Sequence, residues 1–254
     1  MNTRIAGRLL TLMLAVCITP AVSGVLVPPG LAGLVPGSGD ASPFGAGDVG
    51  GIYITGFQQI FDSSLFSGPI TITGLQFFNT QFVDPGYDTI NDSVYTVNLF
   101  TTSLTIYQLD PTALANNLFF TSNPGTLFSG ELSGTVNGSF TVAPSDPSFY
   151  YNYDPSQGNL LLYITKTGNA NGPSLFLDTA SDPSVLMSEA TEFSTTFDPA
   201  DPNATLTVNV TPNYGLVTEF VTPTDLSTPE PGTFVPCVLA TFVLGLRLRR
   251  KKIL

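Results

Sequence analysis

The stretch Ile70-Thr-Ile-Thr-Gly-Leu75 decides the fold class. In an extended chain its two isoleucines point to one side, and its two threonines and Leu75 point to the other, because successive side chains of a strand alternate between faces. The stretch Thr96-Val-Asn-Leu99 alternates in the same way. Alternation with a period of two residues indicates a β-strand, so both stretches predict strands.

Short runs of similar composition recur along the chain, rich in Val, Ile, Thr, Tyr and Phe and separated by turn residues. Only residues 110–117 and 184–193 have a pattern that allows a helical turn or two. Many short strands with Gly and Asp-Pro turns predict an all-β domain, an antiparallel β-sandwich of which a jelly roll is one form. The predicted strands are 52–61, 70–79, 94–100, 104–108, 127–132, 139–142, 160–166, 174–178, 205–210 and 216–221.

Half of the aspartates precede a proline. An Asp carboxylate accepts backbone N–H bonds in turns, and the following proline fixes φ. These pairs are therefore predicted to form the turns between strands. They begin at Asp84, Asp110, Asp146, Asp154, Asp182, Asp198 and Asp201.

Composition excludes several classes of function. The 254 residues carry 19 acidic and 8 basic side chains and no histidine. Without histidine there is no Ser-His-Asp or Cys-His catalysis and no imidazole metal site. The acidic balance argues against a nucleic-acid partner, since phosphate binding needs clustered Lys and Arg. The 24 glycines and 21 prolines argue against a helical architecture.

The amino-terminal end has the layout of a secretory signal peptide. Two arginines precede the apolar run 9–18, which is shorter than the roughly 20 residues a spanning helix needs. Ala21 and Ser23 are the small residues that signal peptidase reads, so we expect a signal helix in residues 1–23 and cleavage after Ser23. The alternatives are a buried helix of a soluble fold and a lipoprotein modified at Cys17.

The carboxy-terminal end combines three features: the tripeptide Pro229-Glu230-Pro231, an apolar segment over about 233–246 and a basic terminus. The apolar segment is short for a membrane helix, but Arg247 can extend its charged head to the interface. The basic terminus is predicted to stay cytoplasmic, which puts the preceding residues outside. The basic cluster comprises Arg247, Arg249, Arg250, Lys251 and Lys252.

Pro229-Glu230-Pro231, the apolar segment and the basic cluster together resemble the PEP-CTERM sorting signal of Gram-negative bacteria. The resemblance implies that the tail holds an exported protein in the inner membrane until an exosortase-type membrane protease cuts near the tripeptide. Pro236 and Cys237 depart from the small and aliphatic residues usual in that helix. The alternative is a plain membrane anchor.

The central stretch Tyr153-Asp-Pro-Ser-Gln-Gly-Asn-Leu-Leu-Leu162 is similar to ectodomains that recur among PEP-CTERM proteins. That resemblance implies a single β domain and brings no known activity. Between the two ends Lys166 is the only base, and no cysteine is present, so the exported part is strongly acidic and has no disulfide. The predicted domains are a signal peptide at 1–23, a flexible Gly/Pro-rich arm at 24–50, the β-sandwich at 51–222 and the sorting tail at 223–254.

A calcium site is one interpretation of the acidic loop at Asp84, Asp88, Asn91 and Asp92, because calcium takes oxygen ligands from loop carboxylates and amides. The spacing does not match an EF-hand, and ordinary turns are the alternative. No other cofactor is expected.

The aromatic run Phe149-Tyr-Tyr-Asn-Tyr153 offers a sugar-stacking surface, since Phe149, Tyr151 and Tyr153 share one face of a strand. The alternative is that one face of this strand belongs to the core and the other lies at the surface. Paired carboxylates could cleave a glycoside, but Glu189 and Glu192 are more simply a solvated face.

The sequence therefore predicts no catalytic residues and a non-enzymatic exported protein. We expect a membrane-tethered intermediate with a periplasmic ectodomain, followed by a location at the cell surface or in the extracellular matrix. The expected partners are signal peptidase, an exosortase-type protease and extracellular polysaccharide, with no nucleic acid. The alternatives are a carbohydrate-binding module and a secreted glycoside hydrolase.

Overall fold

A computed structural model of the protein describes residues 23–29, 34–45, 53–80, 86–168, 174–195, 201 and 203–223. Residues 1–22 of the predicted signal peptide (1–23) and residues 224–254 of the predicted sorting tail (223–254) lie outside these ranges. Every strand pairing among the described residues is antiparallel. The prediction of an all-β fold with antiparallel sheets is confirmed.

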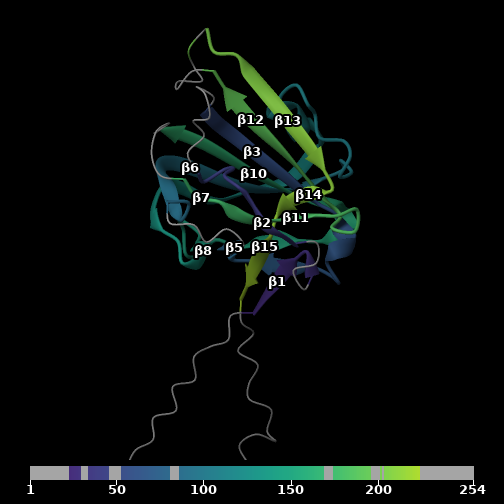
Figure 1. Cartoon of the computed structure of the whole chain (residues 1–254). Helices are drawn as coiled ribbons and strands as arrows, with labels where there is room; N and C mark the ends of the chain where they lie inside the picture. Colours follow the sequence, from purple (N-terminus) through teal and green to yellow (C-terminus); the bar gives the residue numbers. More distant parts are fainter. Residues whose placement is uncertain are drawn as a thin grey trace, which may run out of the picture. The chain divides into compact units, whose positions relative to one another are not determined.

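The largest sheet has six strands in the order β13-β12-β3-β10-β6-β7, and it fills the upper half of Figure 1. Along β10, Leu160 and Leu162 face one side and Leu161 the other, and all three are buried. Both faces of this sheet are therefore covered at its centre. The strands are β3 (Tyr53–Phe61), β6 (Thr89–Thr102), β7 (Thr121–Thr135), β10 (Asn159–Gly168), β12 (Met187–Ser194) and β13 (Leu206–Pro212).

Three smaller sheets accompany it, with strand orders β1-β15-β5-β8, β14-β11-β2 and β4-β9. The strands are β1 (Ser23–Val27), β2 (Leu34–Asp40), β4 (Ile70–Ile72), β5 (Gly74–Asn79), β8 (Gly138–Val142), β9 (Tyr151–Tyr153), β11 (Leu177–Ser181), β14 (Tyr214–Leu216) and β15 (Thr218–Thr222). The helices are short: α1 (Leu114–Asn117) and the 3-10 turns η2 (Ser63–Leu65), η3 (Leu118–Phe120) and η4 (Pro155–Gln157).

One apolar cluster joins the six-stranded sheet to the smaller sheets. Phe57 and Leu162 enter it from the six-stranded sheet, Phe220 from the four-stranded sheet and Leu177 from the three-stranded sheet. The ring centroids of Phe61 and Phe220 are 5.0 Å apart across this junction. Burial of this shared surface is the main force that holds the sheets together.

A second apolar cluster covers the opposite face of the six-stranded sheet. Ile60 and Leu161 of the sheet pack there against Leu104, Ile106 and Leu114. The predicted strand 104–108 is wrong, because this stretch turns back to place alternate apolar side chains on the sheet. The helical turn predicted within 110–117 is confirmed as α1.

Two other predicted elements change in the structure. The pattern of residues 184–193 allowed a helical turn or two, but from Met187 onward they form β12, which is paired on one side with β3 and on the other with β13. Pairing along both edges overrides a weak local helical pattern. The predicted strand 70–79 divides at Thr73 into β4 and β5, because β4 pairs with β9 while β5 pairs with β15 and β8.

The predicted flexible arm at 24–50 is wrong for its described residues. β1 pairs with β15 along its whole length, and β2 pairs with β11. Phe44 is fully buried, with its ring 5.2 Å from those of both Phe77 and Tyr95. Gly and Pro indicated a linker, but the few apolar side chains between them supply core contacts.

Candidate functional site

The Asp-Pro pairs form turns wherever the structure describes them. In each, the Asp carboxylate accepts the backbone N–H of the second residue along, as at Asp154, which accepts from the Ser156 N–H at 2.9 Å. Hydrogen bonds from the Thr112 hydroxyl and backbone lower the pKa of Asp110 to about 2. The same geometry occurs at Asp110, Asp146, Asp182 and Asp201, while Asp84 and Asp198 lie outside the described residues.

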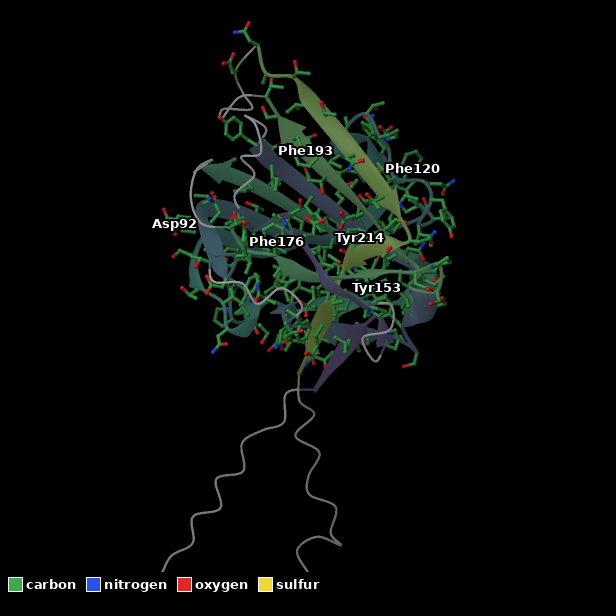
Figure 2. The ribbon with its side chains drawn as sticks, viewed as in Figure 1. Asp92, Phe120, Tyr153, Phe176, Phe193 and Tyr214 are labelled. Atoms are coloured by element: carbon green, nitrogen blue, oxygen red, sulfur yellow. The ribbon has the colours of Figure 1, made fainter. Side chains whose placement is uncertain are left out.

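The aromatic run is a core element and not a sugar-stacking surface. Tyr151 is 3% exposed and Tyr153 1%, and Phe149 packs partly buried against the same cluster. The Tyr153 hydroxyl donates to the Gly158 carbonyl, and its ring meets that of Phe66 edge to face with the centroids 4.9 Å apart, inside the body of the domain (Figure 2). A sugar ring cannot reach these faces, so the sugar-stacking prediction is wrong.

The alternation of side chains along that run was predicted correctly, but Phe149, Tyr151 and Tyr153 form its inner face. The residues between them form the outer face. Tyr150 is 56% exposed, and Asn152 is also exposed, accepting from the Thr71 hydroxyl at 2.9 Å. Which face is buried depends on β4, the strand that pairs with β9. Because β4 is distant in sequence, the aromatic run itself does not indicate which of its faces is covered.

The predicted calcium ligands do not form one site. Asn91 is fully buried, and its side-chain oxygen accepts from the Ser93 hydroxyl at 2.7 Å. Asp92 is exposed on the other face of β6, so these two side chains cannot hold one ion. Asp88 accepts from the Thr89 hydroxyl, and Asp84 lies outside the described residues. Nowhere in the described ranges do three His, Cys, Asp or Glu side chains gather as metal ligands.

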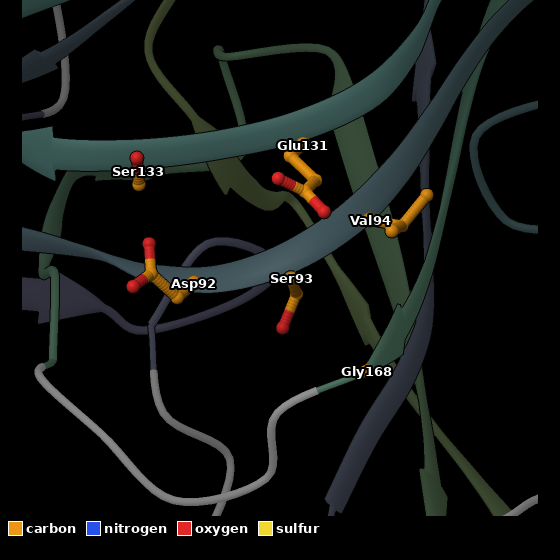
Figure 3. Close-up of a pocket in the computed structure, with 6 residues that line it drawn as sticks. All are labelled: Asp92, Ser93, Val94, Glu131, Ser133 and Gly168. Carbon is orange, nitrogen blue, oxygen red and sulfur yellow. The ribbon is translucent and has the colours of Figure 1, made fainter.

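Asp92 instead lines an open pocket of about 420 Å³ at one end of β6, β7 and β10. Figure 3 shows Asp92 and Glu131 on neighbouring strands at this pocket. Both bear carboxylates, and Val94 is the register partner of Glu131. The pocket is therefore acidic and rich in oxygen. Its lining consists of Asp92, Ser93, Val94, Glu131, Ser133 and Gly168.

A pair of carboxyl groups, one buried and one half-buried, lies between the six-stranded and three-stranded sheets. Glu189 of β12 is 4% exposed and faces Asp40 at the end of β2. The Glu189 Oε2 is buried, and no hydrogen-bond donor in the described part of the chain reaches it. Asp40 also accepts from the Ser42 N–H at 2.6 Å and from the Tyr214 hydroxyl at 3.5 Å. Burial, followed by the charge of Asp40, raises the pKa of Glu189 well above its usual range.

This pair was not predicted, because its members are 149 residues apart in sequence and neither has a distinctive neighbour. Glu189 and Glu192 were interpreted as one solvated face, but Glu189 is buried, and in β12 two residues three apart point to opposite faces. Glu192 accepts from the Thr55 hydroxyl at 3.1 Å.

Lys166 is buried at the end of β10. Its Nζ donates to the Gly45 carbonyl at 2.8 Å, and the side chain is 5% exposed. Burial lowers the pKa of Lys166 to about 8. The single base between the two ends of the chain therefore fixes the turn that carries Phe44.

The predicted sorting motif Pro229-Glu230-Pro231 and the basic cluster lie outside the described residues. Within the described ranges, no helix is long and apolar enough to cross a bilayer.

Comparison of the chain with protein-family models, with curated proteins and with solved structures found no match.

Proposed function

We propose that this is an exported, non-enzymatic protein of the cell surface or extracellular matrix, sorted through a PEP-CTERM-like tail. In this proposal signal peptidase cuts after Ser23, and an exosortase-type membrane protease cuts near Pro229-Glu230-Pro231. The ectodomain would be periplasmic and tethered to the inner membrane until the second cut.

The observation that carries the proposal is the pairing of the first described strand with the last. Ser23 is the register partner of Thr222, so both ends of the described domain leave it at one place (Figure 1). Six residues lie between Thr222 and Pro229, and the seven Cα–Cα steps from one to the other span at most about 25 Å. A tether of this length would hold the folded domain close to the membrane while leaving the tripeptide outside the strands.

The charge distribution also supports an exported surface protein. Lys166 is buried, so the surface between the two ends presents acidic and neutral side chains. A strong net negative charge favours solubility and repels anionic surfaces.

We also propose the finer architecture, a β-sandwich. The shared apolar cluster between the six-stranded sheet and the smaller sheets supports it. The Tyr151 and Tyr153 rings on which the carbohydrate-binding alternative depended are buried, which argues against it. Glu189, one of the two carboxylates considered for a glycoside hydrolase, is also buried, which argues against that alternative.

The test is the intact mass of the protein from its native host, measured in the membrane, surface and medium fractions. A surface or medium species that begins at Gly24 and ends near Pro231 is expected. A mature species that keeps Arg247 to Leu254 in the membrane would overturn the sorting proposal and make the tail a permanent anchor.

A further inference from the structure

Gly24 and Glu219 make an unusually close approach at the edge of the four-stranded sheet. Gly24 is the register partner of Val221, and Glu219 is that of Leu26, so Gly24 and Glu219 are diagonal neighbours on one face. A Cβ added to Gly24 would lie 2.6 Å from Cγ and 2.7 Å from Cδ of Glu219. The Glu219 side chain therefore covers the Cα of Gly24, and its carboxylate lies against the Gly24 backbone.

Glu219 has no basic side chain beside it in the described part of the chain. The one Lys or Arg there is Lys166, whose Nζ donates to the Gly45 carbonyl elsewhere in the fold. Hydrogen bonds between a carboxylate and a cationic donor are stronger than those to a neutral donor. A cation that arises at the Gly24 backbone would therefore be a favourable partner for this carboxylate.

We propose that the Glu219 carboxylate is the ion-pair partner of the mature amino terminus of this protein. Hydrolysis of the Ser23–Gly24 bond adds water across it, leaving a carboxylate on Ser23 and an amine on Gly24 that is protonated at neutral pH. That ammonium pairs with the Glu219 carboxylate and fastens β1 to β15. The inference rests on the proposed function for its cleavage position.

The residue at position 24 has to be glycine for this arrangement. Any larger side chain would occupy the space of the Glu219 methylene and carboxyl carbons and push the carboxylate away from the new terminus. The same glycine thus has two roles. It is a small residue directly after the cleavage site, and its new amine forms the ion pair with Glu219.

The experiment uses the full-length gene expressed with its export signals. Intact mass first establishes the amino-terminal residue of the purified protein. Reductive methylation with 13C-formaldehyde then labels the terminal amine and the lysines, and NMR follows each labelled amine from pH 5 to 10. Two amines are expected in fully processed protein, at Gly24 and Lys166. If the tail is retained, Lys251 and Lys252 add signals that titrate near 10, as exposed lysines do.

The pKa of the Gly24 amine is expected to be about 0.3 to 0.7 higher in the natural protein than in Glu219→Gln. The difference is expected to shrink in 1 M salt, which screens an exposed pair. Glu131→Gln, which removes an exposed carboxylate on β7, is the matched control and should leave this pKa unchanged.

The outcomes separate the two proposals. If Gly24 is the first residue and its amine titrates identically in the natural protein and in Glu219→Gln, the proposed ion pair is overturned. The export proposal still stands in that case. If the mature chain begins at another residue, the cleavage position is overturned and Glu219 cannot receive Gly24.

Discussion

Gln59 of the six-stranded sheet and Leu216 of the three-stranded sheet are joined by two hydrogen bonds. The Gln59 Nε2 donates to the Leu216 carbonyl at 2.9 Å, and the Leu216 N–H donates to Oε1 at 2.8 Å. Gln59 is fully buried. One side-chain amide thus replaces a strand partner for Leu216, and Gly215 leaves room for it, since a Cβ there would lie 2.8 Å from the Gln59 Cδ.

Replacing Gln59 by Leu should destabilise the protein by about 1 to 3 kcal/mol, because the Leu216 N–H would be buried without a partner. The Leu216 carbonyl would keep only the hydrogen bond from the Thr218 hydroxyl at 3.2 Å. Urea unfolding of the purified full-length protein measures the loss. The matched control is Gln76→Leu, which removes one hydrogen bond to Ser139 at a half-buried position and should cost less than about 1 kcal/mol. If the two variants lose the same unfolding free energy, the two hydrogen bonds between Gln59 and Leu216 do not stabilise the protein as proposed.

The Glu189–Asp40 pair should make stability fall as pH rises. The pKa of Glu189 is raised in the folded state, so above the unfolded-state pKa the folded protein binds one more proton than the unfolded chain. Stability is therefore lost as pH rises from that value through the folded pKa. Tyr214, whose own pKa burial raises, and Asp40 are the titratable groups that face Glu189.

Glu189→Gln should remove this dependence, because the amide donates to Asp40 as the protonated acid does but cannot ionise. Unfolding free energies at pH 5 and pH 8 should show the natural protein losing stability relative to the variant. Glu131→Gln should follow the natural protein. A natural protein and a Glu189→Gln variant that keep a constant difference across this range would refute the proton-dependent contact.

Lys166 should give the opposite sign in a different range. Its pKa falls from 10.5 to about 8 on folding, so between these values the unfolded chain binds the extra proton and stability rises with pH. From pH 7.5 to 9.5 the natural protein should gain about 1 to 2 kcal/mol relative to Lys166→Met. Both proteins contain the same tyrosines, so their difference isolates Lys166. Parallel pH profiles would show that the ammonium is not desolvated.

Phe44→Ala should cost about 3 to 5 kcal/mol, because a fully buried ring in contact with Phe77, Tyr95 and Phe140 is removed. Phe119→Ala is the control, since that ring is 84% exposed and its loss should change stability by no more than about 0.5 kcal/mol. If both variants unfold at the same urea concentration as the natural protein, residues 41–45 are not part of the core.

Much of the fold could be predicted from particular residues. Val97 and Leu99 were assigned one face of an alternating strand, and both are buried in the shared cluster. The Asp-Pro turns followed from the chemistry of the dipeptide, and the structure bears this out at Asp146 and Asp182. These features depend on neighbours within a few residues, which a single sequence displays directly.

The candidate site could not be predicted to the same extent. Asn91 and Asp92 are adjacent in sequence, and their spacing in a loop indicated shared ligation, but a strand sends them to opposite faces. Glu189 and Asp40 meet only because β12 and β2 belong to sheets that pack together. A carboxyl group's burial and its partner are properties of the packed chain and not of its local sequence.

The sequence by itself determined the class of structure, the turn chemistry, the acidic character and the candidate sorting ends, because each is written in residue types and short spacings. Only the tertiary structure decided which face of Tyr151 and Tyr153 is buried, that residues 187–194 extend as a strand, and that β1 closes against β15. These outcomes depend on pairing between distant segments, where the burial of shared apolar surface outweighs local preference.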